Sequence, residues 1–194
     1  MSFLTSRDGT LASARAIASP DGIPFMYNSG DNTTAPSNET KITASDAAAS
    51  DEFGYAVAVG SGRVVVGARY DDDAGNASGS AYIFDLEGNQ IAKITASDAA
   101  DGDQFGTSVA AGSGKIVVGA YGNDDAGGAS GSAYIYDLSG TQLAKITASD
   151  AAAGDVFGFA VAVGSGRIVV GARGDDDNGS ASGSAYIFDL DGNQ

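Results

Sequence analysis

Three acidic clusters recur at a constant spacing of 52 residues, beginning at positions 71, 123 and 175. Their carboxylate and amide oxygens are the ligand atoms that calcium prefers, and calcium takes six to eight of them. The neighbouring glycines permit the tight backbone that turns carbonyl groups toward an ion. A divalent cation, Ca²⁺, is the candidate cofactor, and the other interpretation is that no cofactor binds. The candidate metal-ligating residues are Asp71, Asp72, Asp73, Asn123, Asp124, Asp125, Asp175, Asp176 and Asp177.

A second acidic element precedes each cluster and recurs with the same spacing. In the first repeat it consists of Asp46 and Asp51, and its counterparts are Asp98 with Asp103 and Asp150 with Asp155. If the two elements meet at one edge of a sheet, they can share a cation. The alternative is that these aspartates begin turns and keep sheet edges soluble and unpaired. Asn123, which replaces an aspartate, weakens charge-driven binding in the second repeat.

The composition excludes several classes of function. Ten Lys and Arg residues stand against 25 Asp and Glu, for a formal charge of −15. This balance argues against binding to nucleic acid and against insertion into or binding to an anionic membrane, both of which need clustered cations. The chain has no Cys and no His, which removes thiol nucleophiles, disulfides, histidine bases and nearly all zinc or copper sites.

The elements that must position the aspartates are short strands. In residues 53–60, "FGYAVAVG", apolar residues alternate with small ones, which is the period of a β-strand. A Gly-Ser-Gly turn leads to "RVVVGAR", which is apolar on both faces and is expected to be buried on both. The acidic loop follows, and then "SAYIFDL" and "QIAKITAS" supply two further strands. We expect an all-β chain in which small residues, among them Ala56, Ala58 and Gly67, let neighbouring sheets approach closely.

This pattern occurs three times. "KITASD" begins at Lys41, Lys93 and Lys145, and "SGSAYI" recurs at Ser78, Ser130 and Ser182. Four antiparallel strands in about 50 residues, repeated along the chain, are typical of a β-propeller blade. We therefore divide the chain into an N-terminal arm or linker, residues 1–40, and a β-repeat domain, residues 41–194. The repeats are 41–92, 93–144 and 145–194.

The repeats resemble the FG-GAP repeat, the blade unit of integrin α-like propellers and of many bacterial and viral surface proteins. The resemblance rests on Phe-Gly followed by Gly-Ala in each repeat. The matching pairs are Phe53-Gly54 with Gly67-Ala68, Phe105-Gly106 with Gly119-Ala120, and Phe157-Gly158 with Gly171-Ala172. The resemblance implies a propeller-like fold. It does not carry calcium over residue by residue, because the family's Asp-x-Asp-x-Asp-Gly loop between the first two strands is replaced here by Gly-Ser-Gly.

Three repeats are fewer than the four or more blades of known propellers. The last repeat stops at Gln194 without a fourth strand, whereas a spare copy, "TKITAS", lies at residues 40–45. Three arrangements satisfy this pattern. Two or more chains can form a homo-oligomer by exchanging that strand, the chain can be a fragment of a longer array, or three sheets can close as a prism or trefoil.

No constellation of an enzyme is present, because the candidate carboxylates recur in every repeat whereas a catalytic site is normally a single asymmetric cluster. We expect a non-catalytic structural or adhesive module on a virion or an extracellular surface, for example a tail fibre or capsid decoration. Residues 1–40 would anchor it to other virion or surface proteins, and its receptor would be a glycan or a protein. The alternatives are a secreted or cell-surface, calcium-binding bacterial adhesin and, less favoured, a polysaccharide-active enzyme. We find no signal peptide or membrane-spanning segment in the sequence.

Overall fold

The computed structural model describes residues 15–18, 24–27 and 39–194. The chain divides into two compact units, Met1–Glu39 and Thr40–Gln194. In the first unit β1 (Arg15–Ala18) pairs antiparallel with β2 (Pro24–Tyr27). Most of the predicted arm, residues 1–40, lies outside the described residues.

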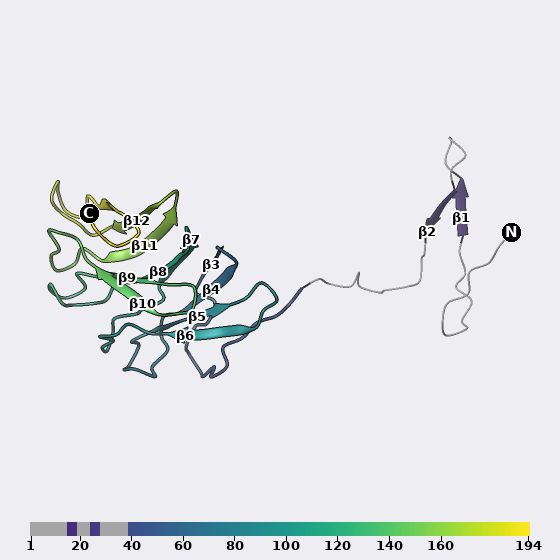
Figure 1. Ribbon diagram of the computed structural model, residues 1–194, viewed down its shortest axis with the longest axis horizontal. Helices are drawn as coiled ribbons and strands as arrows, with labels where there is room; N and C mark the ends of the chain where they lie inside the picture. Colours follow the sequence, from purple (N-terminus) through teal and green to yellow (C-terminus); the bar gives the residue numbers. More distant parts are fainter. Residues whose placement is uncertain (1–14, 19–23, 28–38) are drawn as a thin grey trace. The chain divides into compact units, whose positions relative to one another are not determined.

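The second unit consists of three antiparallel sheets in chain order, and the described residues contain no helix (Figure 1). This confirms the all-β prediction and the blade-like repeats. The third sheet has three strands where the other two have four. The strands are β3 (Ala56–Gly60), β4 (Arg63–Ala68), β5 (Ser80–Phe84) and β6 (Gln90–Ile94); β7 (Ser108–Gly112), β8 (Lys115–Ala120), β9 (Ser132–Tyr136) and β10 (Gln142–Ile146); and β11 (Phe157–Gly164), β12 (Arg167–Ala172) and β13 (Ser184–Phe188).

Each sheet begins with a tight hairpin. Gly60 pairs with Arg63, so the loop between β3 and β4 has two residues, Ser61 and Gly62. Both have positive φ, 50° and 73°, which is the type I′ geometry that matches the twist of antiparallel strands. The same two-residue turn recurs in the second and third sheets.

Glycines let the sheets approach one another closely. A Cβ atom on Gly67 of β4 would overlap the carbonyl oxygen of Gly106 in the second repeat, and one on Gly119 would overlap that of Gly158 in the third. Only a residue without a side chain fits at these two points. The predicted close approach of the sheets through small residues is therefore present.

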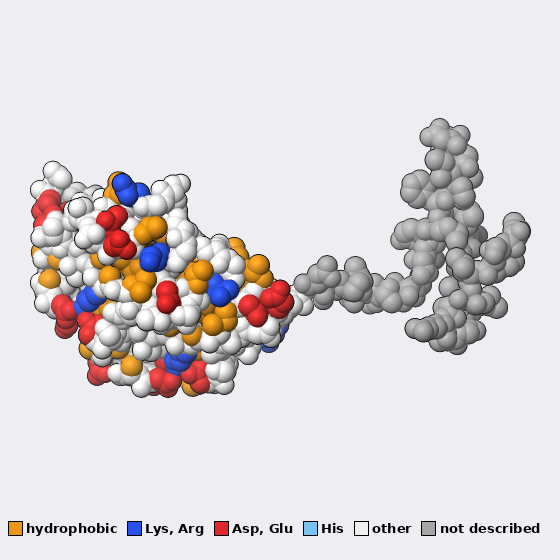
Figure 2. Space-filling model, viewed as in Figure 1, with side chains coloured by type: hydrophobic (Ala, Val, Ile, Leu, Met, Phe, Trp, Pro, Cys, Tyr) orange, Lys and Arg blue, Asp and Glu red, His pale blue; other side chains and the backbone are white. Residues whose placement is uncertain are grey.

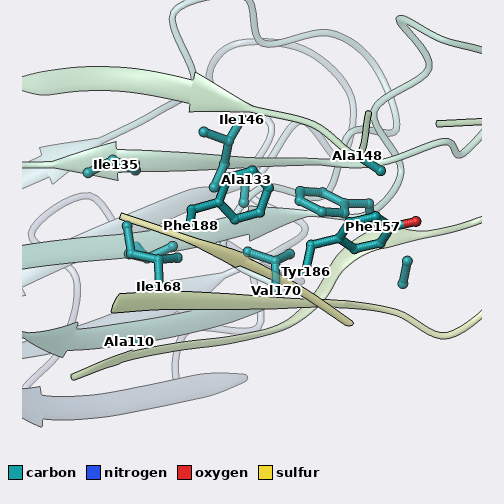
Figure 3. Close-up of a cluster of buried hydrophobic side chains, with 12 residues drawn as sticks. Ala110, Ala133, Ile135, Ile146, Ala148, Phe157, Ile168, Val170, Tyr186 and Phe188 are labelled. Atoms are coloured by element: carbon teal, nitrogen blue, oxygen red, sulfur yellow. The ribbon is translucent and has the colours of Figure 1, made fainter. Parts of the chain in front are cut away.

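The hydrophobic core lies between successive sheets. Figure 3 shows the cluster between the second and third sheets, in which Ile135 and Ile146 face Phe157, Tyr186 and Phe188. Phe157 is fully buried and packs edge-to-face on Tyr186, with 5.5 Å between the ring centroids. An equivalent cluster joins the first and second sheets. The predicted burial of the second strand on both faces holds in the first two sheets, for example at Val65 and Val66, which are 0% and 2% exposed, but not in the third, where Val169 is 37% exposed.

Two loops from successive repeats meet at one end of the sheets. The backbone N–H of Phe105 donates to the Ser78 carbonyl at 2.9 Å, and that of Gly102 donates to the Asn76 carbonyl at 2.9 Å. Gly79 and Phe105 also form an isolated parallel bridge. The acidic loop of one sheet is thus held against the loop that precedes the next Phe-Gly pair.

Candidate functional site

The acidic loop of the first repeat connects β4 to β5 and holds Asp71 in a buried position. The N–H of Gly79 donates to the Asp71 carbonyl at 2.9 Å and closes the loop. The Asp71 Oδ1 atom accepts from the N–H of Asp73 at 3.2 Å, as an aspartate does in a turn. Asp71 is 3% exposed, and its side chain therefore needs partners within the protein.

Asp46 completes a cluster of three carboxylates. The hydroxyl of Tyr82, on β5, donates to Asp46 at 2.9 Å and to Asp71 at 2.8 Å. One oxygen each of Asp46, Asp71 and Asp73 lies within 4.8 Å of the other two. The structure therefore brings together the two acidic elements that the sequence placed 25 residues apart.

Lys93, on β6, places its ammonium group among these three carboxylates. Its Nζ atom lies 2.8 Å from Asp46, 2.9 Å from Asp71 and 2.5 Å from Asp73. The Lys93 side chain is 19% exposed. One cation from the protein itself thus closes the first cluster, and a divalent ion bound to the same three oxygens would have to displace it.

The second repeat builds the same cluster with one charge fewer. Asn123 occupies the position of Asp71, and the Ser132 hydroxyl donates to its Oδ1 atom at 2.8 Å. Lys145 lies 2.6 Å from Asp98 and also pairs with Asp125. Tyr134 donates to Asp98 at 2.8 Å, so that the arrangement of hydroxyl, lysine and carboxylate is kept.

The third cluster consists of Asp150, Asp175 and Asp177, whose oxygens again lie within 4.8 Å of one another. Tyr186 donates to Asp150 at 2.8 Å and to Asp175 at 2.9 Å. Within the described residues, no lysine or arginine forms an ion pair with this cluster. The third cluster therefore has the carboxylates of the first without its cation.

The remaining acidic candidates lie outside the clusters. Asp72, Asp124 and Asp176 are exposed and belong to none of the three-carboxylate groups found among the described residues. Asp51 accepts the N–H of Ala48 at 2.7 Å, and the corresponding turns are closed by Asp103 and Asp155. These last three aspartates cap turns, as the alternative interpretation of the sequence expected.

The lysines and tyrosines control the ionisation of the clustered aspartates. The hydrogen bond from Lys93 is the main reason that the pKa of Asp46 falls below its ordinary 3.8. Burial alone raises the pKa of Asp71, but hydrogen bonds from Lys93 and Tyr82 outweigh it and lower that pKa. In the third repeat the charges of Asp175 and Asp150 raise the pKa of Asp177. Figure 2 shows basic side chains next to acidic ones on the visible face.

These shifts predict a loss of stability in acid. An aspartate whose pKa is lower in the folded chain stabilises the fold above its unfolded pKa and loses that effect as pH falls through the folded value. The pKa values of Asp46, Asp71 and Asp98 are all lowered in the folded chain, whereas that of Asp177 is raised. We expect an unfolding temperature that is constant from about pH 7 to about pH 5 and falls below about pH 4.

Circular dichroism melts between pH 7 and 2 check this expectation. Asp71→Asn should make the acid decline shallower, because the amide does not titrate and Asn123 already occupies the equivalent position. An unfolding temperature that rises below pH 4, or an equal decline in the variant, would contradict the assignment.

A second polar group lies beside the first acidic loop. The Arg69 guanidinium stacks over the ring of Tyr55, 3.8 Å from its centroid, and over that of Tyr70 at 4.3 Å. Its Nε atom donates to Glu52 at 2.9 Å. Tyr55 and Tyr70 are 45% and 36% exposed. This group presents aromatic surface to solvent, and the Arg69 side chain beneath the two rings is 19% exposed.

Comparison with known protein families matches three segments to the FG-GAP repeat: residues 36–84, 89–136 and 141–188. Together they cover most of the chain. The chain belongs to the FG-GAP repeat family. A search of curated proteins finds no significant match.

FG-GAP repeats are β-propeller-like units that in general are non-catalytic and serve in binding or adhesion, and they are typical of extracellular or surface proteins. Members of the family often bind Ca²⁺, and the acidic clusters of this chain have the donor atoms to hold a metal. Of the two complete groups of three carboxylates, only the third is free of a lysine among the described residues. No helix among the described residues is long and apolar enough to cross a membrane.

Sequence reasoning missed the lysines and tyrosines of the clusters. Lys93 lies 20 residues beyond Asp73 in the chain, at the start of what looked like a landmark of the next repeat. The signal was nevertheless present, because Lys93 and Lys145 recur with the same 52-residue spacing as the aspartates.

Proposed function

We propose that this chain is a non-catalytic adhesion module of a phage particle, in a tail fibre or a capsid decoration. In this proposal the sheet stack displays its loops toward a receptor on the host surface. The N-terminal unit, Met1–Glu39, attaches the stack to other proteins of the particle. The division of the chain into two compact units supports such an assignment of roles.

The observation that carries the proposal is the group in which the exposed rings of Tyr55 and Tyr70 stack on the guanidinium of Arg69. Tyr and Arg are enriched among the residues that dominate binding energy at protein interfaces. The ring stacking and the pairing with Glu52 hold the Arg69 side chain in one orientation before a ligand arrives. Such preorganisation lowers the entropy lost on binding. Rigid support comes from β3, which begins directly after Tyr55, and from β4, which ends directly before Arg69.

Competition for adsorption tests the proposal. Excess purified chain should slow the adsorption of the particles to their host cells, because it occupies the same receptors. A double variant, Arg69→Ala with Tyr70→Ala, should compete at least about tenfold less well, as expected for loss of two central contacts. Arg167→Ala is the matched control, since Arg167 is an exposed arginine outside this group.

Two results would contradict the proposal. The purified chain could leave adsorption unchanged at saturating concentration, which would exclude receptor binding by this module. The double variant could instead compete as well as the wild type and the control, which would exclude the Tyr55–Arg69–Tyr70 group as the contact.

A further inference from the structure

The third sheet presents an apolar face that its counterparts keep covered. Val169 of β12 and Ile187 of β13 are 37% and 59% exposed, whereas Val65, Val117, Ile83 and Ile135 at the equivalent positions are fully buried. The equivalent residues are covered because the next sheet packs on them. The outer face of the third sheet thus has the side chains of an inter-sheet contact.

The first sheet presents the opposite face of the same kind of contact. Val57 and Val59 on β3 are 69% and 71% exposed. Their counterparts on β11, Val161 and Val163, pack against the core between the second and third sheets. The outer faces of the first and third sheets therefore carry the two complementary surfaces that pack together between successive sheets inside the chain.

A cavity of about 370 Å³ marks where the Phe-Gly pair of a following sheet would lie. It is lined by Gly171, Ala172, Gly183 and Ser184, together with Phe159 and Arg173. In the second repeat the equivalent Gly119 and Gly131 lie directly against Gly158 and Phe157 of the third sheet. We call the cavity the Phe-Gly socket. Phe53-Gly54 of the first repeat is the pair that no socket within the described residues holds, and Phe53 is only half-buried where Phe105 and Phe157 are fully buried.

Residues 40–45 contact the first sheet in the way that the equivalent residues 92–97, at and after the end of β6, contact the second sheet. Ser45 exchanges hydrogen bonds of 3.1 Å with the Gln90 side chain, and Ser97 exchanges equivalent bonds with Gln142. Ile42 lies against Gly88 just as Ile94 lies against Gly140. Segment 40–45 is therefore placed as the last strand of a preceding sheet, none of whose other strands is among the described residues.

Lys41 has the sequence position of Lys93 and Lys145 in that strand, and it is exposed. Lys93 and Lys145 enter the acidic clusters of the first and second sheets. The third cluster, Asp150 with Asp175 and Asp177, receives no such lysine from the described residues. Among the described residues, Lys41 is thus the one lysine of the three KITASD segments that enters no cluster, and Asp150–Asp175–Asp177 is the cluster that no lysine enters.

We propose that two copies of this chain associate head to tail, and that Lys41 of each copy enters the Asp150–Asp175–Asp177 cluster of the other. Residues 40–42 then pair with β13, as the equivalent residues 92–94 of β6 pair with β5. Phe53-Gly54 of the same copy enters the Phe-Gly socket, and Val57 and Val59 cover the face that carries Val169 and Ile187. This contact between copies has the same arrangement as the contact between successive sheets within one chain. The strand, the lysine and the Phe-Gly pair are therefore all contributed by the same copy.

Two such contacts close a ring of six sheets. A head-to-tail contact is heterologous, and it forms a ring when its rotation closes and a filament when it does not. Six lies within the usual four to eight blades of a propeller. In the ring, the first sheet of each copy packs on the third sheet of the other. Both exposed ends of each stack are therefore covered.

Light scattering and sedimentation of the 194-residue chain, with EGTA present, test the proposal. We expect about twice the monomer mass of 19.1 kDa. Lys41→Gln should raise the dissociation constant at least about tenfold, because it leaves a carboxylate cluster desolvated without its cation. Gly171→Ala should do the same by filling the socket. Lys115→Gln, at a lysine outside every cluster, is the control and should leave the mass unchanged.

The two variants separate association from folding. A Cβ atom on Gly171 lies 3.7 Å from its nearest neighbour, Ala160, which is ordinary van der Waals contact, and Lys41 is exposed. Both variants should therefore fold as monomers with the wild-type circular dichroism spectrum.

Three results would overturn the proposal: a wild-type monomer at micromolar concentration, a dimer that survives both substitutions, or an open polymer in place of a dimer. A wild-type chain that stays monomeric and gains thermal stability on addition of CaCl₂ would assign the third cluster to a metal instead.

Discussion

Replacing Lys93 by methionine will lower the free energy of unfolding by about 2–3 kcal/mol. Removal of one partner of a buried ion pair costs about 3–5 kcal/mol because the other charge is left without compensation. We take a lower value because the Lys93 side chain keeps 19% of its exposure and Asp73 keeps 64%. Asp71, at 4%, has no such access to solvent. For a chain of this size the unfolding temperature should fall by roughly 4–12 °C.

Thermal melts followed by circular dichroism measure this effect at pH 7. The matched control is Lys115→Met, which removes a lysine from the start of β8 and from no acidic cluster. An unfolding temperature lowered equally by both substitutions would show that Lys93 contributes only as a surface lysine. Lys145→Met should resemble Lys93→Met but cost less, because Asn123 carries no charge to be left unpaired.

Gly119→Ala should have an even larger effect, with a loss of about 3 kcal/mol or more. The added methyl group would overlap the carbonyl oxygen of Gly158, so the second and third sheets would have to separate at their closest point. Overpacking of this kind typically costs 1–3 kcal/mol or more when the backbone itself is the obstacle. The φ angle of Gly119 is not positive, and backbone strain therefore does not contribute.

Gly171→Ala is the matched control for Gly119→Ala. It makes the same chemical change at the equivalent position of the third sheet, where the methyl group meets only ordinary contacts. Urea unfolding of both variants in the Lys41→Gln background keeps association out of the comparison. Equal midpoints for the two variants would contradict close stacking of the sheets through glycine.

Much of the fold could be predicted from the sequence because it depends on local patterns. Alternating residues in "AVAVG" give β3, and Ser61-Gly62 gives a two-residue turn. The repeat spacing then extends these elements to all three sheets. The strand limits were less well predicted, since β3 begins at Ala56 and β11 at Phe157, although the two sequences are closely similar.

The composition of the acidic clusters could be predicted only in part. The sequence indicated that Asp46 and Asp71 could meet, because both elements recur with the same spacing. It did not indicate that Lys93 would neutralise them, because that lysine comes from a strand on the far side of β5. The Phe-Gly socket was missed for a similar reason, since Gly171 lies on β12 and Gly183 directly before β13, whereas the pair proposed to enter it, Phe53-Gly54, belongs to the first repeat.

The calcium stoichiometry of the wild-type chain tests most directly whether lysines close the acidic clusters. Isothermal titration of CaCl₂ into chelator-treated protein at neutral pH measures it. We predict that the wild-type dimer binds no calcium ion at these clusters, because Lys93 and Lys145 already occupy two of them and, in the proposed dimer, Lys41 of the other copy occupies the Asp150–Asp175–Asp177 cluster. Three calcium ions per chain, one for each repeat, would contradict this prediction and make the clusters metal sites.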